Sequence, residues 1–256
     1  MNLPDPEDLL VMLSVFIRAG TFLLLIPAFG RPVPILVRVA IAIFLAVAVT
    51  PILGAGEGGG LPTHWGGLAV LVVKESFIGF MMSVAVAFTF YLCQMAGQFI
   101  SMEIGLIQSN LFNPLMSEQQ SVLSTGMTLL ALALLFSLNL HHLFLAAFIQ
   151  SFEVVPAGAG QAAPISVEQV VNGLGKLFLL ATQMAAPFIA VNFIITLSFA
   201  ILGRAVPAMN VLILSFSARI GVGLFILTLV FLVLAQFLLG ALERTPDRML
   251  QFLPMR

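Results

Sequence analysis

Five long stretches of this chain contain no charged residue. They cover residues 39–56, 76–102, 119–152, 177–203 and 220–242. Each is long enough, or nearly so, to cross a bilayer as a helix of about 20 apolar residues. Residues 9–29 form a further apolar stretch that only Arg18 interrupts. The pattern therefore predicts six helices, at about 9–29, 35–53, 67–92, 122–149, 174–202 and 211–240.

The composition agrees with a membrane protein. Charged residues make up 8 % of the 256 residues and hydrophobic residues 61 %, whereas about 25 % of an average soluble domain is charged. The net charge of −1 supplies no field that would attract nucleic acid. These values exclude a soluble enzyme, a nucleic-acid-binding protein and a disordered chain. We predict an all-α, polytopic membrane protein, because strands of a membrane barrel would alternate apolar and polar residues.

The loops predict an orientation that conflicts with the basic C-terminus. Arg31, Arg38 and Arg204 place two connections on the cytoplasmic side, since cytoplasmic loops are rich in Lys and Arg. The acidic start and the glycine-rich connection 54–60 then face the opposite side. Six spans would also put the C-terminus there, although residues 244–256 contain three arginines. Either one span is miscounted or the chain does not lie in the bilayer in the ordinary way.

The residue types that catalysis or metal binding requires are scarce. His141 and His142 are adjacent, and neighbouring helical residues point about 100° apart, so they cannot ligate one metal from one face. We expect them to mark the polar end of the fourth helix, and we expect the single Cys93 to be a small core residue. We predict no catalytic residue, no metal site and no cofactor.

Charges within or beside the apolar stretches are more informative. A lone charge in the middle of a membrane helix costs roughly 3 kcal/mol or more, so Arg18 needs a partner or water, and Glu75 is a possible partner. The candidate intramembrane or inter-subunit charges are Arg18, Lys74, Glu75, Glu103, Arg204 and Arg219. They either form helix ends and ion pairs that set packing, or they face other subunits or a water-filled path.

Prolines and small residues favour a packed assembly. Pro27, Pro51 and Pro187 lie in or at the ends of apolar helices, where proline removes a backbone hydrogen bond and kinks the helix. In the fifth helix one stripe carries small and polar residues, which favour close helix packing in lipid. The stripe contains Thr182, Ala185, Asn192, Thr196 and Gly203.

Residues 103–121 do not resemble a plain solvent loop. They are rich in amide and hydroxyl side chains but also contain seven large apolar residues. Asn113-Pro114 forces a turn, and Gly105 tolerates backbone angles that other residues avoid. We expect this segment to pack into a constriction or a partner.

Short motifs follow one another along most of the chain. They are Arg18-Ala19-Gly20, Pro27-Ala28-Phe29-Gly30, Val33-Pro34, Arg38, Lys74-Glu75-Ser76-Phe77-Ile78-Gly79, Gly97, Gly105-Leu106, Phe112-Asn113-Pro114, Phe136, Asn139, His142, Ser151-Phe152, Pro156-x-Gly158, Arg204, Pro207 and Asn210. This ordered set, at this length and hydropathy, resembles the FliR family of flagellar type III protein-export gate subunits and their injectisome counterparts. Two positions depart from the family pattern: Asn113 stands where Asp is usual, and Glu103 where Gln is usual.

The resemblance implies a fold and a role without catalysis. It implies kinked helices arranged as hairpins in a single domain, 1–256, with a FliP-like part at about 1–160 and a FliQ-like hairpin at about 161–256. It implies FliP and FliQ as partners, FlhB at the cytoplasmic side, lipid around the complex and unfolded export substrates in its channel. The location would be the bacterial inner membrane, in the flagellar basal body.

The resemblance also implies a plug that closes the pore. Its residues would be Gly105, Leu106, Ile107, Leu111, Phe112, Asn113 and Pro114.

Three other functions compete with a flagellar export gate. One is the same subunit in a virulence injectisome, which the sequence barely separates from the flagellar reading. Another is a secondary transporter for a small solute, which would show an internal repeat and a polar site at mid-membrane. The last is an intramembrane hydrolase, which would need a nucleophile and a base on neighbouring helices. The sequence shows neither the transporter features nor the hydrolase features.

Overall fold

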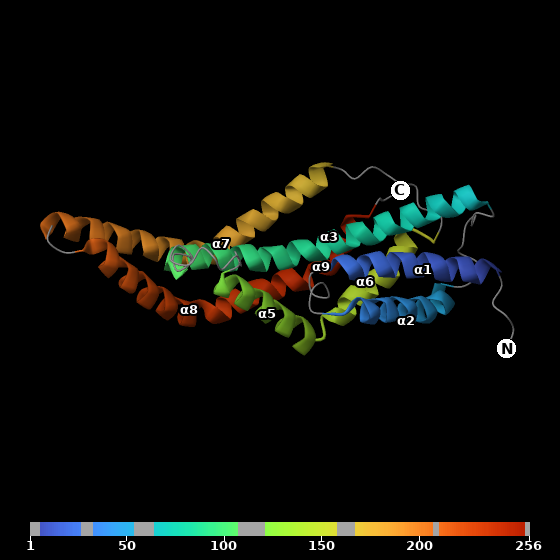
Figure 1. Cartoon of the computed structure of the whole chain (residues 1–256), viewed down its shortest axis with the longest axis horizontal. Coiled ribbons are helices and arrows are strands. Elements are labelled where there is room, and N and C mark those ends of the chain that lie inside the picture. The colour runs from blue at the N-terminus through green and yellow to red at the C-terminus, as the bar shows by residue number, and fades with distance from the viewer. Residues whose placement is uncertain are drawn as a thin grey trace. The chain divides into compact units, whose positions relative to one another are not determined.

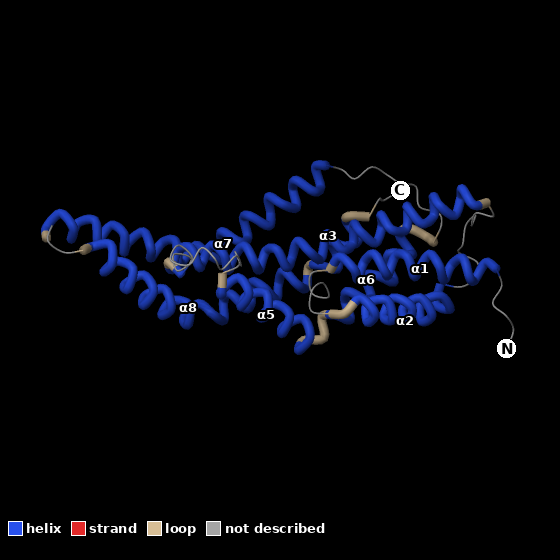
Figure 2. Tube along the Cα trace, viewed as in Figure 1, coloured by secondary structure: helices blue, strands red, loops and turns tan. Residues whose placement is uncertain are grey.

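The computed structural model describes residues 6–26, 33–53, 64–106, 121–157, 167–206 and 210–253, and these contain helices and no strand. Figures 1 and 2 show the helices and the connections between them. The helices are α1 (Pro6–Leu25), α2 (Ile35–Leu53), α3 (Trp65–Ile104), α5 (Val122–Ser137), α6 (His141–Val154), α7 (Val167–Ala205), α8 (Val211–Glu243) and α9 (Thr245–Gln251). The prediction of an all-α chain is confirmed.

The helices are long and apolar enough to cross a membrane. Among the described residues five helices meet this criterion, or six if α5 and α6 are taken together as one bent span. Their backbone groups bond within each helix, which a membrane interior requires because it offers no water to replace those bonds. The prediction of a polytopic membrane protein with about six spans is therefore confirmed.

Burial differs sharply from helix to helix. In α3 the chain itself buries 67 % of the apolar window, whereas in α7 it buries 11 % and in α2 and α8 17 % each. The exposed side chains of these three helices include Phe44, Phe193 and Leu232. The chain thus builds its own core around α3 and leaves α2, α7 and α8 largely uncovered.

One compact unit contains Met1–Phe90, Phe136–Gly173 and Leu242–Arg256. In it α1 packs against α2, and α6 packs against the short C-terminal α9. The Phe22 and Phe148 rings stack at 5.7 Å, which joins α1 to α6. The hydroxyls of Thr89 and Thr245 share a hydrogen bond of 2.7 Å, which joins α3 to α9.

The other unit contains Tyr91–Leu135 and Leu174–Ala241. Here α3 and α5 approach so closely at Gly97 that a Cβ there would lie 2.5 Å from the Cα of Ser124. The α8 residue Gly223 lies beside Ile104 of α3 in the same way, since a Cβ on it would lie 2.6 Å from the Ile104 side chain. Gly97 thus lets the backbones of α3 and α5 meet, as is typical of membrane helix pairs, whereas Gly223 leaves room for the Ile104 side chain.

The third helix is longer than the sequence predicts. The expected end near residue 92 is wrong, because α3 continues to Ile104. The added turns contain Gln94, Gln98, Ser101 and Glu103, and most of them belong to the charge-free stretch 76–102. Glu103 accepts a hydrogen bond from Asn192 of α7, whereas Ser101 is buried and its hydroxyl has no hydrogen-bond partner among the described residues.

The fourth predicted helix is two helices. The expectation of one helix over 122–149 is wrong, because α5 ends at Ser137 and α6 begins at His141. Asn139 lies between them with a φ of 55°, a left-handed conformation that Asn adopts more readily than most residues. His141 and His142 therefore mark the start of α6 after this break and not the polar end of a single helix.

Candidate functional site

Arg18 is the most completely enclosed charge among the described residues. Its Nε donates a hydrogen bond to Glu75 Oε2 at 2.7 Å, and the two side chains are 0 % and 1 % exposed. The pair joins the middle of α1 to the first half of α3. The structure thus places Arg18 against Glu75, the partner that the sequence suggested.

The rest of the guanidinium group is also occupied. Its Nη1 donates to Ser151 Oγ and its Nη2 to the backbone oxygen of Val155, both at 3.1 Å. The Phe152 ring lies against the guanidinium, with 3.8 Å between the Arg18 Cζ and the ring centre. We call Arg18, Glu75, Ser151, Phe152 and Val155 the Arg18 cluster.

The Arg18 cluster holds three helices of one unit. Val155 follows the last residue of α6, so Arg18 donates hydrogen bonds both to the end of α6 and to a side chain of α3. A buried charge is tolerated only when it is paired and hydrogen-bonded, and both conditions are met within this chain. The cluster is therefore an internal support of the unit.

A glycine one turn beyond Glu75 makes this arrangement possible. A Cβ on Gly79 would overlap the Thr21 hydroxyl and would lie 2.6 Å from the backbone oxygen of Arg18. Residues at i and i+4 share a helix face, so Glu75 and Gly79 both face α1. The spacing Glu75-x-x-x-Gly79 is a signal of this contact. Ser151-Phe152 is among the motifs noted in the sequence, but nothing there indicated Arg18 as its partner, and Val155 carries no signal.

A second polar cluster lies in the other unit, where α3, α7 and α8 meet. Asn192 Nδ2 donates to Glu103 Oε2 at 2.6 Å, and Arg219 Nη2 donates to Thr196 Oγ1 at 3.2 Å. Thr196 Oγ1 in turn donates to the backbone oxygen of Asn192 at 2.8 Å. We call Glu103, Asn192, Thr196 and Arg219 the Glu103 cluster.

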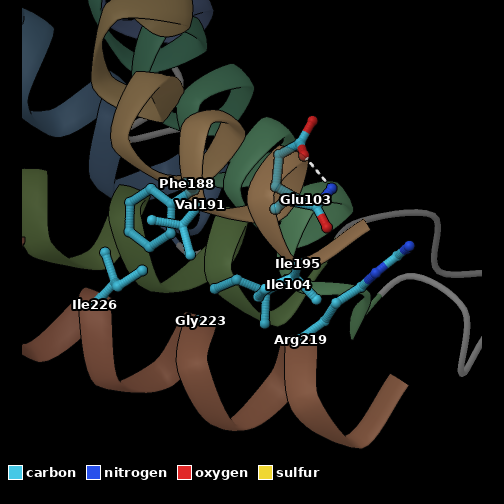
Figure 3. Close-up of a pocket in the computed structure, with 9 residues that line it drawn as sticks. Glu103, Ile104, Phe188, Val191, Ile195, Arg219, Gly223 and Ile226 are labelled. Carbon is cyan, nitrogen blue, oxygen red and sulfur yellow. Dashed lines mark hydrogen bonds between the residues drawn. The ribbon is translucent and has the colours of Figure 1, made fainter. Parts of the chain in front are cut away.

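Glu103, Asn192 and Arg219 of this cluster line a small, partly open cavity of about 10 Å³. Figure 3 shows Glu103 and Arg219 on one side of it and the apolar Phe188, Val191 and Ile226 on the other. Asn192 and Thr196 belong to the small and polar stripe noted in the sequence, but nothing in that stripe indicated their partners.

The remaining predicted charges are not brought to either cluster. Lys74 is half-buried beside Glu75, and Arg204 is exposed in the last turn of α7. A cation in that position is favourable, because the C-terminal end of a helix carries partial negative charge. Whether Lys74 and Arg204 face other subunits stays a prediction.

Most of the predicted plug lies outside the described residues. This holds for Ile107, Leu111, Phe112, Asn113 and Pro114. Gly105 and Leu106 are described, and Gly105 has a φ of 87° directly after α3 ends. Its amide nitrogen donates to the backbone oxygens of Ser101 and Met102, so Gly105 terminates α3 in the left-handed conformation that glycine favours.

Neither cluster resembles a metal or catalytic centre. Within the described ranges no group of three or more His, Cys, Asp or Glu side chains could hold a metal ion. Both clusters instead combine one carboxylate, one guanidinium and neutral hydrogen-bonding groups. Groups of this kind stabilise the packing of helices and form polar contacts.

A family model described as bacterial export proteins, family 1, matches residues 9–245. That range includes both clusters and nearly the whole chain. The chain belongs to this family of bacterial export proteins.

Two of the similar proteins have flagellar names, and a third is named for protein translocation. The chain is 29 % identical over 216 residues to the flagellar biosynthetic protein FliR of Caulobacter vibrioides, covering 84 % of this chain and 86 % of that protein. It is 29 % identical over 221 residues to the FliR protein of Bacillus subtilis, covering 84 % and 83 %. It is also 25 % identical over 152 residues to the Yop proteins translocation protein T of Yersinia pestis, covering 58 % of each chain.

Proposed function

We propose that this chain is a structural and gating subunit of the flagellar type III export gate. It would help form the channel through which unfolded flagellar proteins cross the bacterial inner membrane. The observation that carries the proposal is the match over 84 % of the chain to relatives named flagellar biosynthetic protein FliR. The polar clusters support it, because their chemistry is that of packing and contact.

The proposed partners are FliP and FliQ, with FlhB at the cytoplasmic side, in the basal body of the flagellum. The uneven burial supports a requirement for partners, since the chain covers only 11 % of the apolar window of α7 and 17 % of those of α2 and α8. We assign the subunit no catalytic step and no cofactor.

We further propose a FliP-like part at about 1–160 and a FliQ-like hairpin at about 161–256. Contacts between α7 and α8 support the hairpin. Gly203 near the end of α7 lies against Val211 at the start of α8, since a Cβ added to Gly203 would lie 3.2 Å from the Val211 side chain. Thr196, further back in α7, bonds to Arg219, further along α8. The two helices therefore run antiparallel.

We also propose that residues 105–114 close the channel at rest. A protein-conducting pore must be shut when idle, because ions would otherwise flow down the membrane potential. The left-handed turn at Gly105 supports the proposal, because it redirects the chain sharply where this segment begins.

The second candidate function is that of the equivalent subunit in a virulence injectisome. The similarity to the Yop proteins translocation protein T supports it, although that match covers 58 % of the chain against 84 % for the flagellar relatives. The flagellar function is therefore the better supported of the two.

Genetic replacement followed by purification tests the proposal. The gene is deleted in its host, a tagged copy is supplied, and swimming is scored in soft agar. The tagged protein is then extracted in mild detergent and its companions are identified by mass spectrometry. We expect loss and recovery of motility together with recovery of FliP and FliQ. Normal motility in the deletion strain, or injectisome subunits as the only companions, would contradict the flagellar proposal.

A further inference from the structure

Two buried polar atoms of the Glu103 cluster have no hydrogen-bond partner among the described residues. They are Asn192 Oδ1, which accepts hydrogen bonds, and Arg219 Nε, which donates one. Most buried polar atoms in native proteins have a partner, from the protein or from ordered water. An acceptor and a donor that are both unpaired beside one cavity indicate that something polar belongs between them.

The orientation of the Asn192 amide is fixed by its neighbour. The Glu103 carboxylate only accepts hydrogen bonds when ionised, so Asn192 must turn its NH₂ group toward it, as the 2.6 Å contact shows. The amide oxygen is then left facing the rest of the cluster. The unpaired acceptor is thus a consequence of the Glu103 contact.

The cavity has room for one very small molecule. Asn192 and Arg219 both line it, and its volume of about 10 Å³ corresponds to roughly one water molecule. Phe188, Ile195 and Ile226 complete its wall with apolar surface. This excludes a lipid headgroup, a phosphate or a nucleotide.

The charges around the cavity exclude a bare ion. Glu103 and the amide oxygen of Asn192 would repel an anion, and the Arg219 guanidinium would repel a cation. Only a neutral molecule that both donates and accepts satisfies an acceptor and a donor at once. Water meets this condition and fits the volume.

We propose that this cavity holds one ordered water molecule, which donates to Asn192 Oδ1 and accepts from Arg219 Nε. The water joins the Glu103–Asn192 pair to the Thr196–Arg219 pair. Glu103 and Arg219 make no direct ion pair in the described part of the chain. Their opposite charges are instead linked through neutral groups that span α3, α7 and α8.

The bridge ties the two least buried helices of this unit to α3. A water-mediated link costs little more than a direct hydrogen bond and exchanges easily. It therefore holds α7 and α8 in register with α3 while permitting small adjustments between them. This role concerns the chain's own packing and does not depend on what the chain exports.

Direct observation is the first test. The complex that the full chain forms in the cell is purified, and its structure is determined by electron microscopy at a resolution that shows ordered water. We expect a water-sized peak about 2.7–3.2 Å from both Asn192 Oδ1 and Arg219 Nε. Clear density for both side chains without that peak would overturn the proposal, as would a partner side chain or lipid in its place.

A double-mutant cycle is the second test, with the melting midpoint of the same complex as the readout. Arg219→Lys keeps the charge but replaces the Nε–H group with a methylene, and Asn192→Leu removes the amide. Each should lower the midpoint by about 2–4 °C or more. Because either change releases the water, the melting midpoint of the double variant should fall by clearly less than the sum of the two single decreases.

Ser198→Ala is the matched control. The Ser198 hydroxyl is exposed on α7 and bonds only to the backbone oxygen of Ile194 in its own helix. Its removal should leave the midpoint unchanged and should add nothing to either variant. Strict additivity of Asn192→Leu and Arg219→Lys would refute the bridge, because independent sites contribute independently.

Discussion

Arg18 illustrates how a charge in the middle of a membrane helix becomes tolerable. Three hydrogen bonds and a ring face occupy its guanidinium group, and all of them come from the same chain. This pairing offsets the cost of burying the charge, because each of the three guanidinium nitrogens has a partner within the chain. The residue therefore serves the fold of its own unit before any assembly.

Removal of the Arg18 charge should be costly, and removal of both charges less so. Arg18→Leu leaves the Glu75 carboxylate buried without its cation, which typically costs about 3–5 kcal/mol. Arg18→Leu/Glu75→Leu should recover much of that loss, since apolar side chains often replace a buried ion pair at little cost. Thermal unfolding of the purified complex measures both.

Lys176→Leu is the control for the Arg18 variants. Lys176 is exposed on α7, so its removal should cost less than about 1 kcal/mol. A single Arg18→Leu variant as stable as the parent would show that the charge is solvated rather than paired.

Two glycines of one unit should respond to alanine in opposite directions. At Gly97 a Cβ would lie 2.5 Å from Ser124 Cα and 2.7 Å from Leu123 O, and backbone atoms cannot move aside. Gly97→Ala should therefore destabilise by about 1–3 kcal/mol. At Gly126 nothing lies within 4 Å of the added Cβ, so Gly126→Ala should stabilise by about 0.4–1 kcal/mol. Equal effects on the melting midpoint would contradict the close contact of α3 and α5.

Among the helices, the break between α5 and α6 depends on a single backbone conformation. Asn139 has a φ of 55°, which costs a β-branched residue about 1–3 kcal/mol. Asn139→Val should lower the melting midpoint accordingly, whereas Asn139→Gly should keep it near that of the parent. A valine variant that melts like the parent would show that α5 and α6 can join as one helix.

The segment that follows α3 is proposed to close the channel. Deletion of residues 106–112 removes most of its apolar bulk and should raise ion or small-molecule leakage in cells that carry the whole complex. Assembly, checked by co-purification, should persist. Intact assembly without added leakage would argue against the plug, and lost assembly would assign the segment a packing role instead.

In the molecule as a whole, burial is concentrated on α3. A chain that covers 67 % of one span and 11 % of another is only partly packed by itself. We expect the subunit expressed alone to aggregate or be degraded, and co-expression of FliP and FliQ to rescue its yield. Size-exclusion chromatography in mild detergent reports the outcome. A stable, monodisperse subunit without partners would contradict this expectation.

Much of the architecture was predictable because long apolar stretches have few alternatives in a membrane. The starts of α2, α5 and α8 lie at or within a residue of the predicted ones, since prolines and polar residues mark them. The extension of α3 was missed although the charge-free stretch continues to residue 102; the sequence does not show that Asn192 of α7 bonds to Glu103 and so extends the helix beyond that stretch. The break at Asn139 was not predictable, since no Pro or Gly marks it.

For the sites, the charge of Arg18 identified the residue and suggested Glu75, whereas the Ser151 and Val155 contacts arise only from tertiary packing.

The Arg18 cluster also sets an order of events during synthesis. Glu75 follows Arg18 by 57 residues, and Ser151 follows it by 133. At about 5–20 residues per second a ribosome needs roughly 3–11 s to make the first of these partners and more than twice as long to make the second. During that interval the cation in α1 has none of its final partners. The contacts that fix the first helix therefore cannot be complete until α3, and then α6, has been made.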